Sequence, residues 1–270
     1  LRPCCDNRLG SAVMLQYAVL GSGSSGNSYV FSDGTVSFLI DQGYSVVELK
    51  RRLERFCIGL ETVQAVFVTH LHPDHAKGVG ILCRRQPAGA YISSRSMLEQ
   101  PDQFAKLGIP LQQVFPVEPF EVVEIGPFSL FCFATSHDSA GSVGWFITYE
   151  DQNLMVLTDT GLTTVEHKQL AKDANILFLE ANYDKRMLET GPYPLYLKRR
   201  IDGSHGHLSN EQALLFLKDS GFAGNHIYFI HLSDVNNDPA LLEKAARRTI
   251  QTPFTVCHKN QWYGPQPEAL

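Results

Sequence analysis

Short apolar runs, bounded by Gly, Pro, Asp or Asn, alternate along the chain with segments whose apolar residues recur at helical spacing. The runs predict buried strands and the helical spacing predicts amphipathic helices packed against them. Strands are predicted within 63–70, 174–184 and 226–233, on either side of Gly126-Pro127, and in a hairpin over 144–161 that turns near 151–153. Helices are predicted over 45–56, 93–108 and 207–221, the last with Ser209 and Gln212 in capping-box spacing and Gly221 as its stop. This mixture indicates an α/β fold.

The stretch "GSGSSGNS" has the glycine spacing of a dinucleotide-binding loop. Gly21, Gly23 and Gly26 match G-x-G-x-x-G, and Asp41 follows Gly21 by 20 positions, as that fingerprint requires. The next residues, "NSYVFSDGTVSFLIDQG", are two β-rich runs joined at Asp-Gly, a dipeptide typical of hairpin turns. Because a dinucleotide loop must lead directly into a helix, we interpret the glycines as residues of a tight turn.

Composition narrows the class of protein. The 270 residues are 44% hydrophobic and 19% charged, with a formal net charge of -5, so the chain can bury a core. No run of eighteen apolar residues is present and the first residues lack the apolar stretch of a secretory signal. We expect a cytoplasmic protein with one domain over 14–270 and residues 1–13 outside the fold, without a membrane partner or an evident obligate protein partner. The six cysteines form no C-x-x-C pair, which favours reduced thiols.

The heptapeptide "THLHPDH" directly follows an apolar run and contains four potential metal ligands, His70, His72, Asp74 and His75. In an extended segment, residues two apart point to the same side, so His70 and His72 can share one ion. A turn at Pro73 redirects Asp74 and His75 toward a neighbouring position. The spacing therefore indicates two metal ions.

Three other apolar runs also end in a potential ligand. His137 follows "FCFATS", Asp159 follows "LMVLT" and His231 follows "IYFI". Ends of strands are where a sheet-borne active site collects its residues, so we expect these side chains to join the heptapeptide.

The pattern His-x-His-x-Asp-His, then His, Asp and His, resembles the metallo-β-lactamase-fold hydrolases from about residue 15 onward. The resemblance implies a four-layer αββα sandwich of two mixed sheets flanked by helices. It implies that one ion is held by His70, His72 and His137 and a second by Asp74, His75 and His231, with Asp159 bridging both. Many true β-lactamases of this fold have a cysteine where this chain has Asp159, which disfavours antibiotic hydrolysis.

Imidazoles together with hard carboxylate ligands suit Zn²⁺, which we expect, and also Mn²⁺ or Fe²⁺. Two such ions about 3.5–4 Å apart can share a water and lower its pKa toward about 7, so a bridging hydroxide is the expected nucleophile. The positive charge of the two ions exceeds the combined negative charge of Asp74, Asp159 and this hydroxide, so the site would carry a net positive charge. That charge favours an anionic substrate such as a phosphodiester, and carboxylic esters and lactones stay open.

Glu180 in "LFLEANYD" and His207 in "GSHGHLSN" resemble the pair that protonates the leaving alkoxide in nucleases of this fold. A carboxylate beside an imidazole can hold it in one tautomer and keep it protonated near neutral pH. Asp74, Glu180 and His207 are therefore the candidate catalytic residues. A structural acid and a helix-end histidine are the alternative interpretation.

The strings "GSGSSGNS", "SHD", "EANYD", "GPYPLYLKRRI", "GHLSN" and "HLSDVNN" together resemble the bacterial YycJ/WalJ-type branch, which is associated with 5′ to 3′ exonuclease action on DNA. The basic segment after Glu180 carries cations for phosphates and rings for base stacking. The candidate substrate-binding residues are Lys198, Arg199, Arg200, Tyr193, Ser209 and Asn236. A solvated basic loop with packed tyrosines is the alternative.

The main hypothesis is a dinuclear phosphodiesterase that acts as a DNA exonuclease. Only 72 positions separate Asp159 from His231, which leaves no room for the inserted domain of RNA-processing β-CASP nucleases. A small-molecule hydrolase acting on a cyclic phosphodiester, thioester or lactone is the second hypothesis, and a non-catalytic metal-binding regulator is the third.

Overall fold

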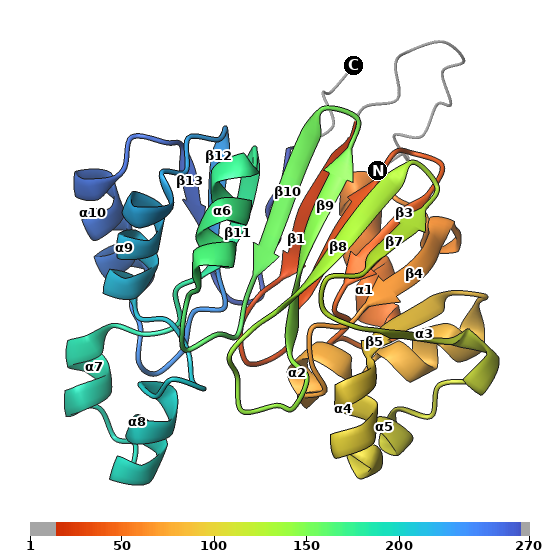
Figure 1. The fold of residues 1–270 in the computed structure, drawn as a ribbon, viewed down its shortest axis with the longest axis horizontal. Coiled ribbons are helices and arrows are strands. Elements are labelled where there is room, and N and C mark those ends of the chain that lie inside the picture. Colours follow the sequence, from red (N-terminus) through yellow and green to blue (C-terminus); the bar gives the residue numbers. More distant parts are fainter. Residues whose placement is uncertain (1–14, 266–270) are drawn as a thin grey trace.

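Two mixed β-sheets face each other in the protein, whose computed structural model describes residues 15–265 (Figure 1). In each sheet the strands lie in chain order. The first sheet begins with antiparallel strands and continues with parallel ones. Its strands are β1 (Gln16–Gly21), β2 (Ser28–Ser32), β3 (Ser37–Ile40), β4 (Val63–Phe67), β5 (Gly89–Ser93) and β6 (Val114–Val117).

The second sheet repeats this plan, because three antiparallel pairs precede three parallel ones. Its strands are β7 (Val122–Ile125), β8 (Phe128–Ala134), β9 (Val143–Tyr149), β10 (Gln152–Leu157), β11 (Ile176–Glu180), β12 (His226–Ile230) and β13 (Phe254–Val256). The candidate metal ligands and Glu180 lie at or just beyond the carboxyl ends of strands. The strands concerned are β4, β8, β10, β11 and β12, and Asp41 follows β3 in the same way.

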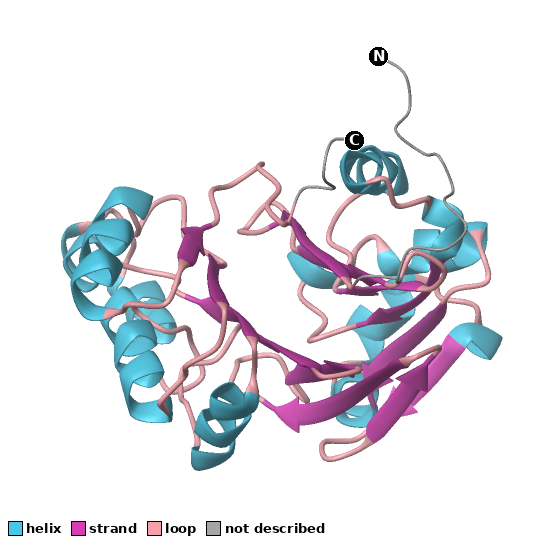
Figure 2. Cartoon of the chain, turned by 90° about the horizontal axis from the view of Figure 1, so that it is seen from above, coloured by secondary structure: helices cyan, strands magenta, loops and turns pink. Residues whose placement is uncertain are grey.

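Helices cover the outer faces of both sheets (Figure 2). Those of the first half are α1 (Val46–Leu53), α2 (Pro73–Ala76), α3 (Val79–Arg85), α4 (Ser94–Glu99) and α5 (Pro101–Leu107). Those of the second half are α6 (Val165–Asp173), α7 (Lys185–Thr190), α8 (Leu195–Ile201), α9 (Asn210–Ser220) and α10 (Pro239–Thr249). The predicted four-layer αββα sandwich is confirmed. None of the helices in 15–265 combines the length and apolar character needed to cross a bilayer.

Alternation along the strands creates three apolar layers. In β4, Ala65 and Phe67 face the layer between the sheets, whereas Val66 faces α1 and α3. The central layer is rich in aromatic rings, and the ring of Phe67 packs edge-on against Trp145 of the opposite sheet at 4.9 Å. This packing fixes the two sheets relative to each other and hence the relative positions of their strand ends.

The glycine-rich stretch forms the turn between β1 and β2, and the antiparallel pair β2 and β3 follows it. Gly23 and Gly26 have φ of 123° and 158°, and a Cβ at Gly26 would lie 2.9 Å from the carbonyl oxygen of Gly43. The prediction of a hairpin in place of a dinucleotide loop is confirmed.

Three local predictions need correction. The single helix predicted over 93–108 is broken into α4 and α5, because Pro101 lacks an amide hydrogen and Gln100 before it leaves the helical region with φ of -129°. The hairpin over 144–161 turns one residue early, at Glu150 and Asp151, because Asn153 pairs across the ladder with Thr148. The basic segment after Glu180, for which a solvated loop was the alternative interpretation, contains the helices α7 and α8.

The capping box predicted for the third helix is confirmed, although the helix itself begins at Asn210. Ser209 Oγ accepts from the amide of Gln212, and Gly221 ends the helix in the left-handed conformation. His207 therefore precedes the helix. The predicted extension at 1–13 lies outside the described residues.

Candidate metal centre

Three strand ends at the site leave the sheet in a conformation that side chains rarely adopt. Asp41 after β3, Asp159 after β10 and His231 after β12 have φ of 59°, 51° and 58°. Backbone in this region is unfavourable for residues other than glycine, and it persists where the surrounding structure fixes it. The sharp turns aim the side chains of Asp159 and His231 across the gap between the two sheets.

The first group of predicted ligands comes together as expected. His70 and His72 follow β4, His137 follows β8, and each of the three offers one ring nitrogen within 4.8 Å of the others. His72 Nδ1 and His137 Nε2 are 3.3 Å apart, which is a separation found between two ligands of one ion.

The second group also converges. Asp74, His75 and His231 offer ligand atoms within 4.8 Å of one another. Asp159 lies between the groups, with Oδ1 at 3.5 Å from His137 Nε2 and 3.7 Å from His231 Nε2. Its Oδ2 is 3.4 Å from His75 Nε2. Asp159 is thus placed where a carboxylate could bridge two ions.

The histidines present one nitrogen to the cluster and the other to an oxygen. The oriented nitrogens are His70 Nδ1 at 3.0 Å from Thr69 Oγ1, His75 Nδ1 at 2.7 Å from Asp41 Oδ2, His137 Nδ1 at 3.0 Å from the Gly206 carbonyl and His231 Nδ1 at 3.0 Å from Glu180 Oε1. The outer nitrogen of His72, Nε2, lies 3.5 Å from Asp138 Oδ1. Such partners fix the tautomer of metal-binding imidazoles.

The donor set fits divalent metal ions. His70 Nε2 is buried and has no hydrogen-bond partner within 15–265, which is costly unless a Lewis acid takes its lone pair. Five imidazoles and two carboxylates suit Zn²⁺, Mn²⁺ or Fe²⁺.

The charges of the metal-free cluster support this interpretation. Burial alone would raise the pKa of Asp159, but the surrounding imidazoles outweigh burial and hold it well below its usual range. The same balance lowers the pKa of Asp74 to about 2. Burial opposes protonation of His75, but Asp159, Asp41 and Asp74 raise its pKa to about 9. In the metal-free protein a proton on His75 therefore balances part of the negative charge of these carboxylates, and divalent ions could balance it instead.

Glu180 has a wider role than the sequence indicated. Its Oε1 lies 2.6 Å from His207 Nδ1 and 3.0 Å from His231 Nδ1, so the predicted pair is in hydrogen-bond contact and a predicted metal ligand shares it. Oε2 accepts from the amides of Thr160 and Leu208, both at 3.2 Å. Glu180 is fully buried, so it can act on the cleft only through the histidines that it contacts.

A cleft of about 350 Å³ opens above these residues. Its floor includes Asp74, Asp159, His207 and His231, and its walls come from α8 and from the loops after β1 and β12. A volume in this range suits a small ligand or one segment of a larger one.

The predicted substrate-binding residues separate into two groups. Tyr193 and Arg200 line the cleft, whereas Lys198 and Arg199 lie outside its lining, and Lys198 Nζ donates to the carbonyl of Glu189. Ser209 caps α9. Asn236 is buried outside the lining, and the two polar atoms of its side-chain amide have no hydrogen-bond partner in the described part of the chain.

Sequence reasoning missed three residues that touch the cluster. Asp41 accepts from His75, Asn27 Nδ2 lies 3.3 Å from Asp74 Oδ2, and Asp138 lies 3.3 Å from His137 Nε2. Asp41 could have been found, because it ends the apolar run "SFLI" as the predicted ligands end theirs. Asn27 and Asp138 carry no such signal.

Residues 37–232 match the β-lactamase superfamily domain. The chain belongs to this superfamily, and it is a metal-dependent hydrolase.

Two curated relatives lie in the predicted YycJ/WalJ branch. The chain is 31% identical over 238 residues to a protein named exodeoxyribonuclease YycJ from Bacillus anthracis, covering 88% of this chain and 89% of that one. It is 30% identical over 230 residues to exodeoxyribonuclease WalJ from Streptococcus pneumoniae, covering 84% and 85%. Among solved structures, the metallo-β-lactamase fold protein YhfI from Bacillus subtilis matches with a TM-score of 0.70 at 19% identity, covering 93% of this chain and 99% of that one. The predicted family and fold are confirmed.

Proposed function

We propose that this protein is a dinuclear metal-dependent exonuclease that hydrolyses DNA in the 5′ to 3′ direction. The observation that carries the proposal is the convergence of two ligand groups, joined by Asp159, with His207 in the lining of the same cleft. The names of the curated relatives support DNA as the substrate.

In this proposal His70, His72 and His137 would hold one ion, Asp74, His75 and His231 would hold the other, and Asp159 could serve both. Two bound Zn²⁺, Mn²⁺ or Fe²⁺ ions would supply Lewis acidity and lower the pKa of a water in the cleft. The buried oxygens that face the outer histidine nitrogens keep the ligating nitrogens aimed at the cluster.

His207 supplies the proton that the leaving group needs. Its Nδ1 faces Glu180 at 2.6 Å, so the hydrogen bond holds Nδ1–H and leaves Nε2 for the cleft. A protonated Nε2 can donate to the leaving O3′ of a DNA strand, which avoids expulsion of a free alkoxide. Glu180 stays buried and positions this ring.

The cleft wall supplies the contacts to the nucleotide. Arg200 can bind a phosphate and Tyr193 offers a ring for stacking, and both line the cleft. Lys198 and Arg199 lie on α8 together with Arg200, and their charges can attract a DNA strand toward the cleft.

The test is digestion of 5′-end-labelled duplex DNA, single-stranded DNA and RNA by protein loaded with Zn²⁺ or Mn²⁺. Stepwise release of nucleotides from DNA, lost in Asp159→Asn and in chelator, supports the proposal. Activity that survives both treatments contradicts it. Hydrolysis of bis(p-nitrophenyl) phosphate or a thioester without cleavage of any polymer would replace it by a small-molecule hydrolase.

A further inference from the structure

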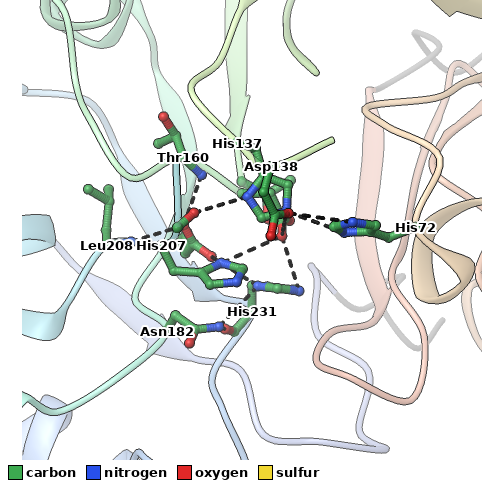
Figure 3. Close-up of polar contacts among 12 residues, drawn as sticks. His72, His137, Asp138, Thr160, Asn182, His207, Leu208 and His231 are labelled. Atoms are coloured by element: carbon green, nitrogen blue, oxygen red, sulfur yellow. Dashed lines mark hydrogen bonds and ion pairs between the residues drawn. The ribbon is translucent and has the colours of Figure 1, made fainter. Parts of the chain in front are cut away.

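Asp138 connects the metal-ligand cluster to helix α8. Its Oδ1 lies 3.3 Å from His137 Nε2 and 3.5 Å from His72 Nε2. Its Oδ2 accepts a hydrogen bond from Nε of Arg200. Figure 3 shows Asp138 between His72 and His137, at the centre of the polar contacts. One carboxylate thus faces the place of the first ion and a guanidinium at once.

Arg200 is the one lysine or arginine in the cleft lining among residues 15–265. Four aspartates line the same cleft, and two of these, Asp74 and Asp159, belong to the ligand groups. The Arg200 guanidinium is therefore the one cationic side chain of the wall that can bind an anionic substrate. In the free protein this guanidinium is already hydrogen-bonded to Asp138.

A carboxylate and a phosphodiester share the relevant chemistry. Each spreads one negative charge over two equivalent oxygens, and the guanidinium fork binds either of them. Asp138 directs one oxygen toward the ligand cluster and the other toward Arg200, and a phosphodiester has two free oxygens that can make the same pair of contacts.

We propose that Asp138 occupies the phosphate subsite of the free protein and that the phosphodiester of the substrate displaces it from Arg200. The exchange replaces hydrogen bonds and breaks no covalent bond. It selects for phosphodiesters, because a neutral ester cannot displace a carboxylate from a guanidinium. This inference rests on the proposed function and names the group that the cleft recognises.

Asp234 provides a matched control. It lines the same cleft and pairs with Lys259, and Ser24 Oγ donates to its Oδ2 at 3.1 Å. Asp234→Asn removes the same charge from the cleft without touching Arg200, so it measures the general electrostatic effect of losing one carboxylate.

The experiment measures binding, so it does not depend on turnover. Fluorescence anisotropy follows a short labelled single-stranded DNA with phosphorothioate linkages on the full chain, with Mn²⁺ and with chelator. The variants are D138N, D138S, R200A, the double variant D138N/R200A and D234N. Metal content and thermal unfolding are measured for each.

We expect D138N and D138S to bind the DNA about two- to fivefold more tightly than the wild type, since an exposed ion pair is worth about that much. D234N should give a smaller gain. R200A should weaken binding about tenfold, and in the R200A background D138N should add no more than the general charge effect that D234N measures, because the carboxylate then has no guanidinium to release.

Three results would overturn the inference. They are equal gains from D138N and D234N, weaker binding by D138N with loss of metal, and a gain from D138N that keeps its full size without Arg200. Failure of the proposed function looks different, because then the wild type neither binds nor cleaves DNA. Thymidine 5′-(p-nitrophenyl phosphate) is the probe in that case, and the same variant order is expected with it.

Discussion

The floor and the rim of the cleft are built in different ways. On the floor, Asp159 and His231 are buried and each contacts several polar partners, which restrict their side chains. The rim is the part of α8 that borders the cleft. There the side chain of Arg200 is 57% exposed, and Tyr196, on the same helix, is 74% exposed. In the proposed function, the floor would determine which reaction is catalysed and the rim which molecule is bound.

The largest effect is expected at the residue that joins the two halves of the floor. Asp159→Asn should lower kcat/KM by at least about 10⁴-fold, because one carboxylate supports both ion sites and several kcal/mol depend on them. Metal analysis and nucleotide release on the same sample check this. Full turnover by Asp159→Asn would show that the two sites do not share this residue.

His207→Ala should remove proton delivery to the leaving group without affecting metal binding on the floor of the cleft. We expect kcat to fall about 10²-fold with DNA while metal content stays unchanged, since in the proposed function the ring donates to the leaving group and holds no ion. A p-nitrophenyl ester needs no proton on its leaving group, so its hydrolysis should fall much less.

His205→Ala is the matched control for that variant, because His205 is exposed and its ring contacts Ser204. Equal losses with both substrates in His207→Ala would show that this histidine does not deliver the proton.

Metal affinity should depend on pH through His75. Its pKa in the metal-free protein is raised from 6.5 to about 9, so a bound ion must displace a proton throughout that interval. Because Asp159, Asp74 and Glu180 also raise the pKa of His231, which must lose its proton too, affinity should rise by at least about tenfold per pH unit up to about pH 9 and less steeply above. Competition titrations with a zinc indicator at several pH values measure this, and a flat profile would contradict the role of His75.

Asp41→Asn tests whether the carboxylate that contacts His75 orients this histidine for metal binding. The Asp41 carboxylate accepts from His75 Nδ1 at 2.7 Å and from the amide of Thr69 at the same distance. Loss of its charge should weaken the second ion about 10- to 100-fold and leave the fold intact. Isothermal titration of the ions and a thermal unfolding curve check both points, and unchanged affinity would refute the orienting role.

The smallest effect is expected on the outer rim. Lys198→Ala should change kcat little, raise KM for DNA by less than about threefold and reduce the dependence of binding on salt. Steady-state kinetics at two salt concentrations measures this. A loss as large as that of Arg200→Ala would move the substrate path to the outer face of α8.

The sequence was most informative where local pattern determines position. His70, His72, Asp159 and His231 each follow an apolar strand, and parallel strands bring their carboxyl ends to one edge, so the cluster could be expected before any coordinates. The capping box of α9 is equally local.

Contacts between distant loops could not be predicted in the same way. Asp138 meets Arg200 only because α8 folds back over the cleft, and Asn27 meets Asp74 only because the first hairpin packs beside α2. The basic segment was not expected to contain helices, since its tyrosines and prolines obscure any helical period.

The most direct test of the account is a titration of metal-free protein with Mn²⁺ or Zn²⁺ in which bound metal and nucleotide release from DNA are measured together. The account predicts that two ions bind per chain, that release requires both, and that Asp159→Asn abolishes this coupling. Full release from metal-free protein, or no release from DNA with both ions bound, would contradict it.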